Sequence, residues 1–177
     1  GLGLSELYVN GAKIGDHVLS PAFAQYNKRE FAVTYDVTKH LQRGANALGV
    51  ILGNGRFYAD RSKVYAGTVN FGFPKLLLNL HVDYTDGSST EIISDNSWKL
   101  TADGPILANN DYDGETYDAR KEFPNWSRAS FNDSQWQAAE LVSAPGGVVS
   151  AEMAEPIRVT GILKPISVKE IRPGDFI

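Results

Sequence analysis

Residues 74–84 read PKLLLNLHVDY, and their alternation of apolar and polar side chains predicts a β-strand with one buried face. The apolar side of this pattern consists of Leu76, Leu78, Leu80, Val82 and Tyr84. The Asp86-Gly87 pair that follows is typical of a tight turn, because glycine readily adopts the positive φ that such turns need. With a return strand over residues 90–93, the stretch 76–94 is predicted to be a β-hairpin.

The same pattern recurs along the chain. Asn10-Gly11 predicts a second tight turn, which joins residues 6–9 (ELYV) to residues 12–14 (AKI). Alternation predicts further strands over residues 31–37 (FAVTYDV) and 48–52 (LGVIL). Short strands at this spacing are typical of an antiparallel sandwich.

Helix signals are few. Asp36 or Thr38 can cap a helix over residues 39–43, and Gly44 can end it, which predicts one or two turns. We therefore predict an all-β fold, an antiparallel jelly-roll-like β-sandwich with few short helical turns.

Length and composition limit the classes of function. The 177 residues, 42% of them apolar, suit one domain with one core. We expect a sandwich over residues 1–155, and a linker strand over residues 156–177 that leads into the next domain of a truncated parent chain. A net charge of −4, with scattered Lys and Arg, disfavours nucleic acid as a partner. No apolar run is long enough to span a membrane, and the absence of cysteine leaves the compartment open.

Catalytic motifs are not found in the sequence. The histidines are His17, His40 and His81, and neither GxSxG nor HExxH is present. The glycines around Asn54 lack the spacing of a phosphate-binding loop. A catalytic domain of its own is therefore not predicted for this chain.

Residues 109–120 (NNDYDGETYDAR) form the densest polar cluster. If the segment is extended, Asp111, Asp113 and Glu115 share one face and repel one another, so they need a cation, an arginine partner or full solvation. An EF-hand is rejected because its twelfth position falls on Arg120.

Three interpretations of this cluster stay open. A looser calcium site takes its oxygen ligands from Asn110, Asp111 and Asp113. A glycosidase acid and nucleophile is a weaker alternative, since the carboxylates are neighbours in one short loop. The third is a structural loop, in which Glu115 pairs with Arg120 while Tyr112 and Tyr117 pack inward.

Sugars need exposed rings for stacking and directional polar groups for their hydroxyls. Trp98 and Trp136 are predicted to anchor the core, whereas Trp126 is undecided. Residues 54–58 (NGRFY) follow a predicted strand and bring together an amide, a guanidinium and a phenol. The candidate carbohydrate-binding residues are Asn54, Arg56, Tyr58, Asn110, Asp111, Tyr112, Asp113, Glu115 and Trp126.

Six further segments are informative when taken together: residues 7–11 (LYVNG), 35–38 (YDVT), 44–48 (GANAL), 52–55 (LGNG), 112–120 (YDGETYDAR) and 156–158 (PIR). Together they resemble the N-terminal domain of bacterial α-L-rhamnosidases. The resemblance covers nearly the whole chain. It implies a parent enzyme that hydrolyses terminal α-L-rhamnosides with inversion, using an acid and a base on an α/α-barrel that lies outside this chain.

The resemblance also implies partners and a role. The partners are the catalytic and other domains of the same parent chain and rhamnose-containing glycans. The implied role is a non-catalytic accessory domain that supports substrate recognition or braces the barrel. Some relatives use this domain as a calcium-dependent rhamnose-binding module with aspartate and asparagine ligands, but here Gly53 precedes Asn54 at the position where an acid is expected. An autonomous glycosidase is the remaining alternative.

Overall fold

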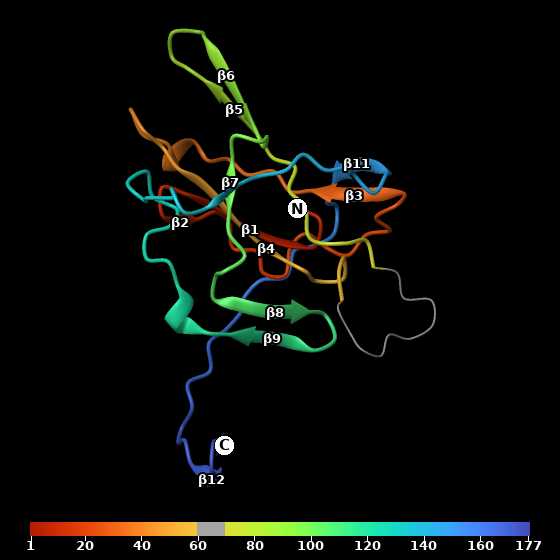
Figure 1. Cartoon of the computed structure of the whole chain (residues 1–177), viewed down its shortest axis with the longest axis vertical. Helices are drawn as coiled ribbons and strands as arrows, with labels where there is room; N and C mark the ends of the chain where they lie inside the picture. The colour runs from red at the N-terminus through yellow and green to blue at the C-terminus, as the bar shows by residue number, and fades with distance from the viewer. Residues whose placement is uncertain (60–69) are drawn as a thin grey trace.

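The computed structural model describes residues 1–59 and 70–177, and within them the secondary structure is short β-strands and two 3₁₀ turns (Figure 1). The strands are β1 (Leu4–Val9), β2 (Ala12–Lys13), β3 (Arg29–Ala32), β4 (Leu48–Gly53), β5 (Asn79–Asp83), β6 (Ser89–Ile93), β7 (Lys99–Leu100), β8 (Ile106–Asn110), β9 (Gly114–Tyr117), β10 (Gln137–Ala138), β11 (Val148–Ala151), β12 (Glu170–Arg172) and β13 (Asp175–Phe176). The 3₁₀ turns are η1 (Thr38–His40) and η2 (Ala119–Lys121). The predicted all-β sandwich is confirmed. None of the helical segments described is long and apolar enough to cross a membrane.

The sheet β2-β1-β4 forms the centre of the molecule. β1 pairs antiparallel with β4 along its whole length, from Leu4 opposite Gly53 to Val9 opposite Leu48. The predicted turn between β1 and β2 is confirmed, because Asn10 and Gly11 both have positive φ, 51° and 88°. One face of this sheet contributes Leu7 and Val50 to a cavity between the layers.

A second pair, β3 and β11, is parallel, with Phe31 opposite Ser150. The predicted strand over residues 31–37 is therefore wrong beyond Ala32. The ladder stops there because β11 ends at Ala151, which is the partner of Ala32, and one further bond runs from the Glu152 N–H to the Ala32 carbonyl. Alternation fixes which side chains share a face, but it does not supply a partner strand.

The predicted hairpin is confirmed as β5 and β6, but its first strand begins at Asn79 and not at residue 74. Before that point the pairing extends only to Leu78, which exchanges hydrogen bonds with Ser94. The strands are in register from Asn79 opposite Ile93 to Asp83 opposite Ser89, and Gly87 in the turn has a φ of 86°. Figure 1 shows this hairpin projecting from the body of the molecule.

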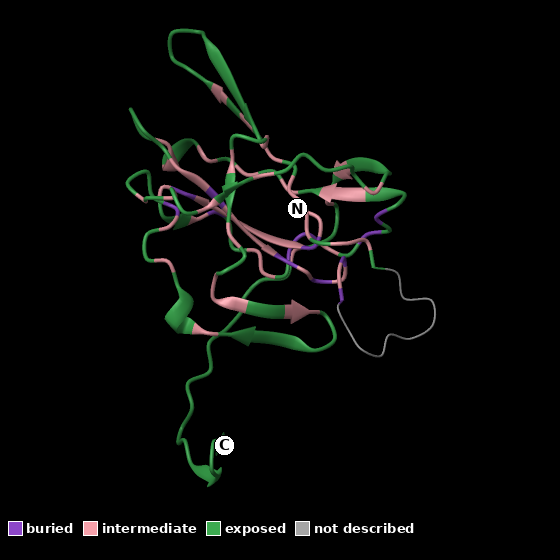
Figure 2. Ribbon diagram, in the orientation of Figure 1, coloured by how far each residue is buried: buried purple, intermediate pink, exposed green. Residues whose placement is uncertain are grey.

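The best-buried cluster is aromatic and lies next to the end of β4. The Tyr26 and Phe57 rings meet edge to face with centroids 4.9 Å apart, and the Phe71 ring lies 5.2 Å from Tyr26 and 5.5 Å from Phe57. Phe57 has no exposed surface. Buried segments, in purple, lie in the body of the molecule and not in the projecting hairpin (Figure 2). This cluster fixes the segment 54–58, which contains the first group of candidate site residues.

Two sequence predictions are corrected in detail. The helix expected over residues 39–43 is the single turn η1, with the Thr38 N–H donating to Asp36 Oδ1 at 2.9 Å. Residues 157–168 do not form the expected linker strand, and their contribution to pairing is a single bridge between Arg158 and His17. Without a neighbouring strand in the described residues, the apolar side chains of this segment stay exposed. The division at residue 155 remains a prediction.

We expect Phe57→Ala to lower the free energy of unfolding by about 3–5 kcal/mol, because it leaves a cavity among the packed rings. Urea denaturation followed by tryptophan fluorescence measures this change. Phe176→Ala is the matched control: this ring is 62% exposed, so its loss should change the unfolding free energy by less than about 0.5 kcal/mol. Equal effects of the two substitutions would show that the ring cluster is not the core.

Candidate functional site

The two groups of candidate residues predicted from sequence lie side by side in the structure. The Asn54 backbone N–H donates to Asn109 Oδ1 at 2.7 Å, and the Asn54 side-chain amide donates to the Asn109 carbonyl at 2.9 Å. A third bond joins the Asp111 N–H to the Gly55 carbonyl at 3.4 Å. The segment after β4 is thereby held against the hairpin of β8 and β9. We call this junction the Arg56 site, after the residue at its centre.

Arg56 lies between two aromatic rings. Its Cζ is 5.2 Å from the centroid of the Tyr112 ring and 5.9 Å from that of Phe23, distances at which a guanidinium is attracted to a ring. Phe23 is 64% exposed and Tyr112 is 42% exposed, so both rings border solvent at the site. The surface combines a planar cation with apolar rings, a combination that suits a ligand with hydroxyl groups and an apolar face.

Asp111 supplies a charge at the same place. The pKa of Tyr26 is raised, first by burial and then by the negative charge of Asp111, while Arg56 acts in the opposite direction. Both charges therefore act on the Tyr26 hydroxyl. Asp111 itself is exposed.

The turn between β8 and β9 is built by Asn110. Its Oδ1 accepts the backbone N–H groups of Tyr112 at 2.8 Å and Asp113 at 2.9 Å, and its Nδ2 donates to Asp113 Oδ2 at 3.1 Å. Gly114 follows with a φ of 76°. Asp111, Asp113 and Glu115 were expected to share one face only if the segment is extended, and this condition is not met because the chain reverses here.

The predicted calcium ligands fit a metal ion only poorly in this arrangement. The Asn110 oxygen is already engaged by two N–H groups, and an Asp113 oxygen accepts the Asn110 amide, whereas calcium takes about six to eight oxygen ligands. In the described part of the chain, no three acidic or histidine side chains are grouped closely enough to hold a metal ion. Calcium binding therefore remains a prediction.

Other candidates are placed as follows. Tyr58 belongs to the Arg56 segment, and its ring lies 5.0 Å from that of Phe73, which is 74% exposed. Glu115 is in β9, exposed, and opposite Asn109 in the β8–β9 ladder. Sequence reasoning missed Phe23 and Phe73, because an aromatic residue in a loop gives no signal that distinguishes an exposed ring from a core ring.

Trp126 does not belong to the site. Its ring packs edge to face against Tyr8 at 5.1 Å and lies directly over Gly49. Gly49 is four residues before Gly53 in β4, or roughly 13 Å at about 3.3 Å per residue. Trp126 thus covers the outer face of the central sheet near its other end.

The predicted pairing of Glu115 with Arg120 is also wrong. Arg120 forms two hydrogen bonds of 2.8 Å with the carboxylate of Asp118, two residues away, and these bonds lower the pKa of Asp118. Tyr112 and Tyr117 do not pack inward; Tyr117 is 50% exposed, and its hydroxyl donates to Glu122 at 2.8 Å. Arg120 pairs with Asp118 because the two residues are only two positions apart, so their contact costs little loop-closure entropy.

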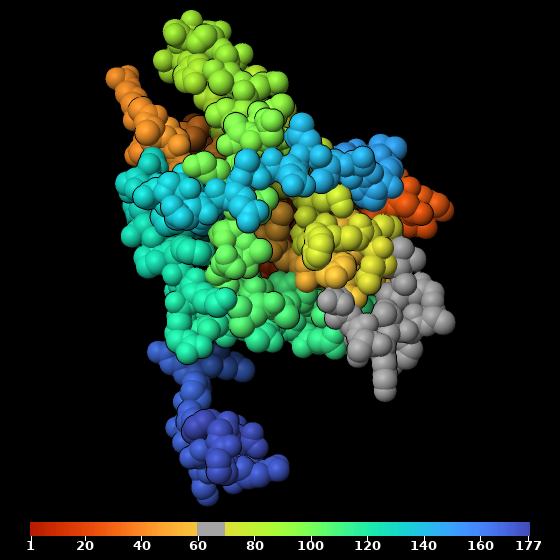
Figure 3. Space-filling view, viewed as in Figure 1, coloured from red at the N-terminus to blue at the C-terminus, as the bar shows by residue number. Residues whose placement is uncertain are grey.

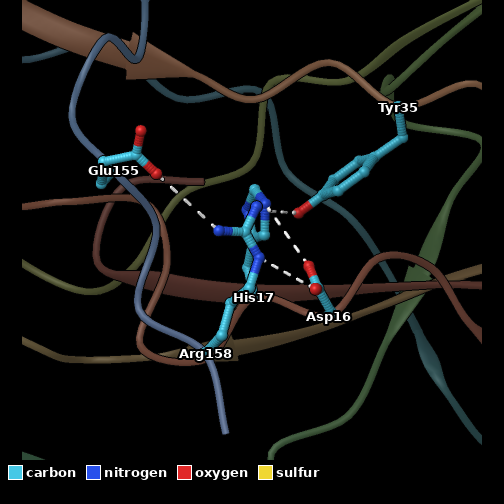
Figure 4. Close-up of polar contacts among 5 residues, drawn as sticks. All are labelled: Asp16, His17, Tyr35, Glu155 and Arg158. Carbon is cyan, nitrogen blue, oxygen red and sulfur yellow. Dashed lines mark hydrogen bonds and ion pairs between the residues drawn. The ribbon is translucent and has the colours of Figure 1, made fainter. Parts of the chain in front are cut away.

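A separate cluster joins His17 to Asp16, Tyr35 and Arg158 (Figure 4). The order of hydroxyl, imidazole and carboxylate resembles a nucleophile relay, but the distances are long, 3.5 Å from Tyr35 to His17 and 3.8 Å from His17 to Asp16. Asp16 instead accepts a 2.9 Å bond from Arg158, which lowers its pKa. The cluster ties the C-terminal segment to the body of the domain.

The family follows from comparison with known proteins. Residues 1–161 match the family model described as the α-L-rhamnosidase N-terminal domain. The chain belongs to this family. An α-L-rhamnosidase of Formosa agariphila is 38% identical over 100% of this chain, and one of Streptomyces avermitilis is 38% identical over 99% of it. These matches cover 19% and 17% of the two relatives, so the chain spans about a fifth of their length.

Solved structures show the same fold. The α-L-rhamnosidase from Dictyoglumus thermophilum superposes with a TM-score of 0.87 and 45% identity, over 99% of this chain and 19% of that one. The Streptomyces avermitilis α-L-rhamnosidase complexed with L-rhamnose gives a TM-score of 0.86 and 33% identity, over 99% of this chain and 17% of that one. The resemblance stated from sequence is confirmed.

We expect Gly49→Ala to destabilise the domain by about 1–3 kcal/mol, because its methyl carbon would lie 2.4 Å from Cζ3 of Trp126 and force the ring away. Chemical denaturation measures the loss. Gly104→Ala, where nothing lies within 4 Å, is the control and should leave stability unchanged. If Gly49→Ala unfolds at the same denaturant concentration as the parent protein, then Trp126 does not pack on the sheet and is a site candidate again.

Proposed function

We propose that this chain is a non-catalytic accessory domain of an α-L-rhamnosidase, and that it recognises rhamnose-containing glycan at the Arg56 site. The observation that carries the proposal is the junction of residues 54–58 with the β8–β9 turn, where Arg56 lies between the exposed rings of Phe23 and Tyr112. The family relation supports the parent activity, which is hydrolysis of terminal α-L-rhamnosides by residues outside this chain.

The chemistry of the site suits a deoxy-sugar. The methyl group and the C–H face of a rhamnose ring need an apolar surface, which the Phe23 and Tyr112 rings offer. Its hydroxyls need a donor fork and an acceptor, which Arg56 and Asp111 supply. The Streptomyces avermitilis relative, which was solved in complex with L-rhamnose, supports a rhamnose ligand for this family of enzymes.

A catalytic role is not favoured by the acidic side chains of the site. Glycosidases place two carboxyl groups on opposite sides of the scissile bond, about 5–9.5 Å apart. Here Asp111 and Asp113 are exposed on a single turn, two positions apart in the sequence. We expect purified protein to show no turnover of an aryl α-L-rhamnoside.

Bracing of the catalytic barrel is the second candidate function. Apolar side chains in the C-terminal segment are largely exposed, among them Ile162 at 83% and Leu163 at 97%. Such side chains favour burial against another part of a larger chain. This role needs no ligand at the Arg56 site, so a titration separates the two candidates.

The deciding experiment is calorimetric titration of this chain with L-rhamnose at millimolar concentration, with calcium and with a chelator. We expect binding, with Asp111→Ala weakening it by at least about tenfold and leaving the melting temperature nearly unchanged, since an exposed acid supports little of the fold. Asp103→Ala removes an exposed acid elsewhere and should bind like the parent protein.

The same titration tests the calcium-dependent alternative. Heat that appears only with calcium identifies a calcium-dependent rhamnose-binding module, despite the engaged oxygen of Asn110. The absence of heat under both conditions would rule out the binding function and leave bracing as the role of the domain.

A further inference from the structure

The guanidinium of Arg56 is held by aromatic rings and not by a carboxylate. Its partners are the rings of Phe23 and Tyr112, and with the described residues its side chain forms no ion pair and no hydrogen bond. Arg120 and Arg158, in contrast, each pair with an aspartate. The positive charge and the five N–H donors of Arg56 are therefore not used within the described part of the chain.

The donors of Arg56 are also reachable from solvent. In the described residues, none of the buried side-chain atoms that lack a hydrogen-bond partner belongs to Arg56. Because its nitrogens have no partner there, they must border solvent instead. Figure 3 shows the segment after β4 and the hairpin of β8 and β9 next to each other at the surface of the molecule. The site thus presents open N–H donors between two exposed rings.

Packing holds this guanidinium in place before a ligand arrives. On one side, the Phe23 ring packs edge to face on Tyr26 with centroids 5.8 Å apart, and Tyr26 packs on the buried ring of Phe57. On the other side, the Tyr112 N–H donates to Asn110 Oδ1 at 2.8 Å, which fixes the turn that carries the ring. A donor group that is already positioned loses less side-chain entropy when it binds a partner.

The geometry of a guanidinium selects a planar anion. Two parallel N–H groups match the two oxygens of a carboxylate, and such charge-assisted bonds are roughly twice as strong as bonds to the neutral hydroxyls of a sugar. The charge of Asp111, whose N–H is bonded to the Gly55 carbonyl beside Arg56, limits the charge of the anion. It would repel a doubly charged phosphate more strongly than a singly charged carboxylate.

We propose that the Arg56 site recognises an acidic glycan, in which a uronic acid next to the rhamnose places its carboxylate on the Arg56 guanidinium. This inference rests on the proposed function, since it keeps the same site and names the class of glycan that the site takes. Five N–H donors are enough for a bidentate carboxylate and for a rhamnose hydroxyl. Asp111 keeps the role of hydroxyl acceptor, and the exposed rings receive the C–H faces of the sugars.

Calorimetric titration of this chain at pH 7 with two disaccharides tests the proposal. One is a rhamnosyl glucuronate, and the other is the rhamnosyl glucose of the same linkage, which replaces the carboxylate with a hydroxymethyl group. At low salt the glucuronate should bind at least about tenfold more tightly, and added salt should reduce this preference. Equal affinities would overturn the inference and leave rhamnose recognition standing. No binding of either disaccharide would overturn both.

Substitutions show whether Arg56 is the group that reads the carboxylate. Arg56→Gln should abolish the preference for the glucuronate, and Arg56→Lys should reduce it, because lysine keeps the charge but not the paired N–H groups. Arg43→Gln is the matched control, since Arg43 is exposed in the loop after η1, which is bonded to Asn10 at the far end of β1. A preference that survives in Arg56→Gln contradicts the proposal. If Arg56→Gln does not fold, an unchanged preference in Arg56→Lys contradicts it.

Simple sugars separate the two parts of the ligand. Binding of D-glucuronate to the parent protein but not to Arg56→Gln, with no heat from L-rhamnose, would support the carboxylate contact and remove rhamnose from the proposed function. D-Glucose 6-sulfate carries a single charge on a tetrahedral group, so it should bind more weakly than D-glucuronate. Equal or tighter binding of the sulfate would overturn the assignment of a carboxylate.

Discussion

The two hydrogen bonds between Asn54 and Asn109 are the contact on which the candidate site depends. They join residues that are 55 positions apart, one at the end of a central strand and one in a hairpin that shares no sheet with it. One bond uses the backbone N–H of Asn54 and the other uses its side-chain amide, so rotation of that amide would break the second bond. Arg56 and Tyr112 face each other as a consequence of this junction.

The junction in turn needs a rigid base, which the rings of Tyr26, Phe57 and Phe71 supply. Phe57 lies between Arg56 and Tyr58 in the sequence, and its burial sends its neighbours toward the surface. This short segment therefore alternates between a side chain that belongs to the core, Phe57, and side chains that belong to the Arg56 site, Arg56 and Tyr58. A change in the packing of Phe57 would alter the direction in which Arg56 points.

Local features of the fold were predictable from sequence, and pairing partners were not. Asn10-Gly11 and Asp86-Gly87 were correctly predicted as turns, because the positive φ at Gly11 and Gly87 is a conformation that glycine adopts readily in any fold. The strand expected over residues 31–37 stops at Ala32 because its partner, β11, lies more than 100 residues later and is itself short. The loop after β4 and the acidic segment were identified as polar clusters, but their meeting depends on long-range topology. Trp126 was misplaced because a tryptophan that covers a glycine has the same sequence appearance as one that binds a sugar.

The two proposed roles, recognition of a glycan and bracing of a neighbouring domain, would use different parts of the molecule. In Figure 1 the hairpin of β8 and β9, which contributes to the Arg56 site, lies beside the central sheet, and the C-terminal segment leads away from the body. The exposed apolar side chains of that segment, among them Ile162 and Leu163, are not part of the Arg56 site. A ligand at Arg56 and a domain packed on the C-terminal segment would therefore not compete for the same side chains.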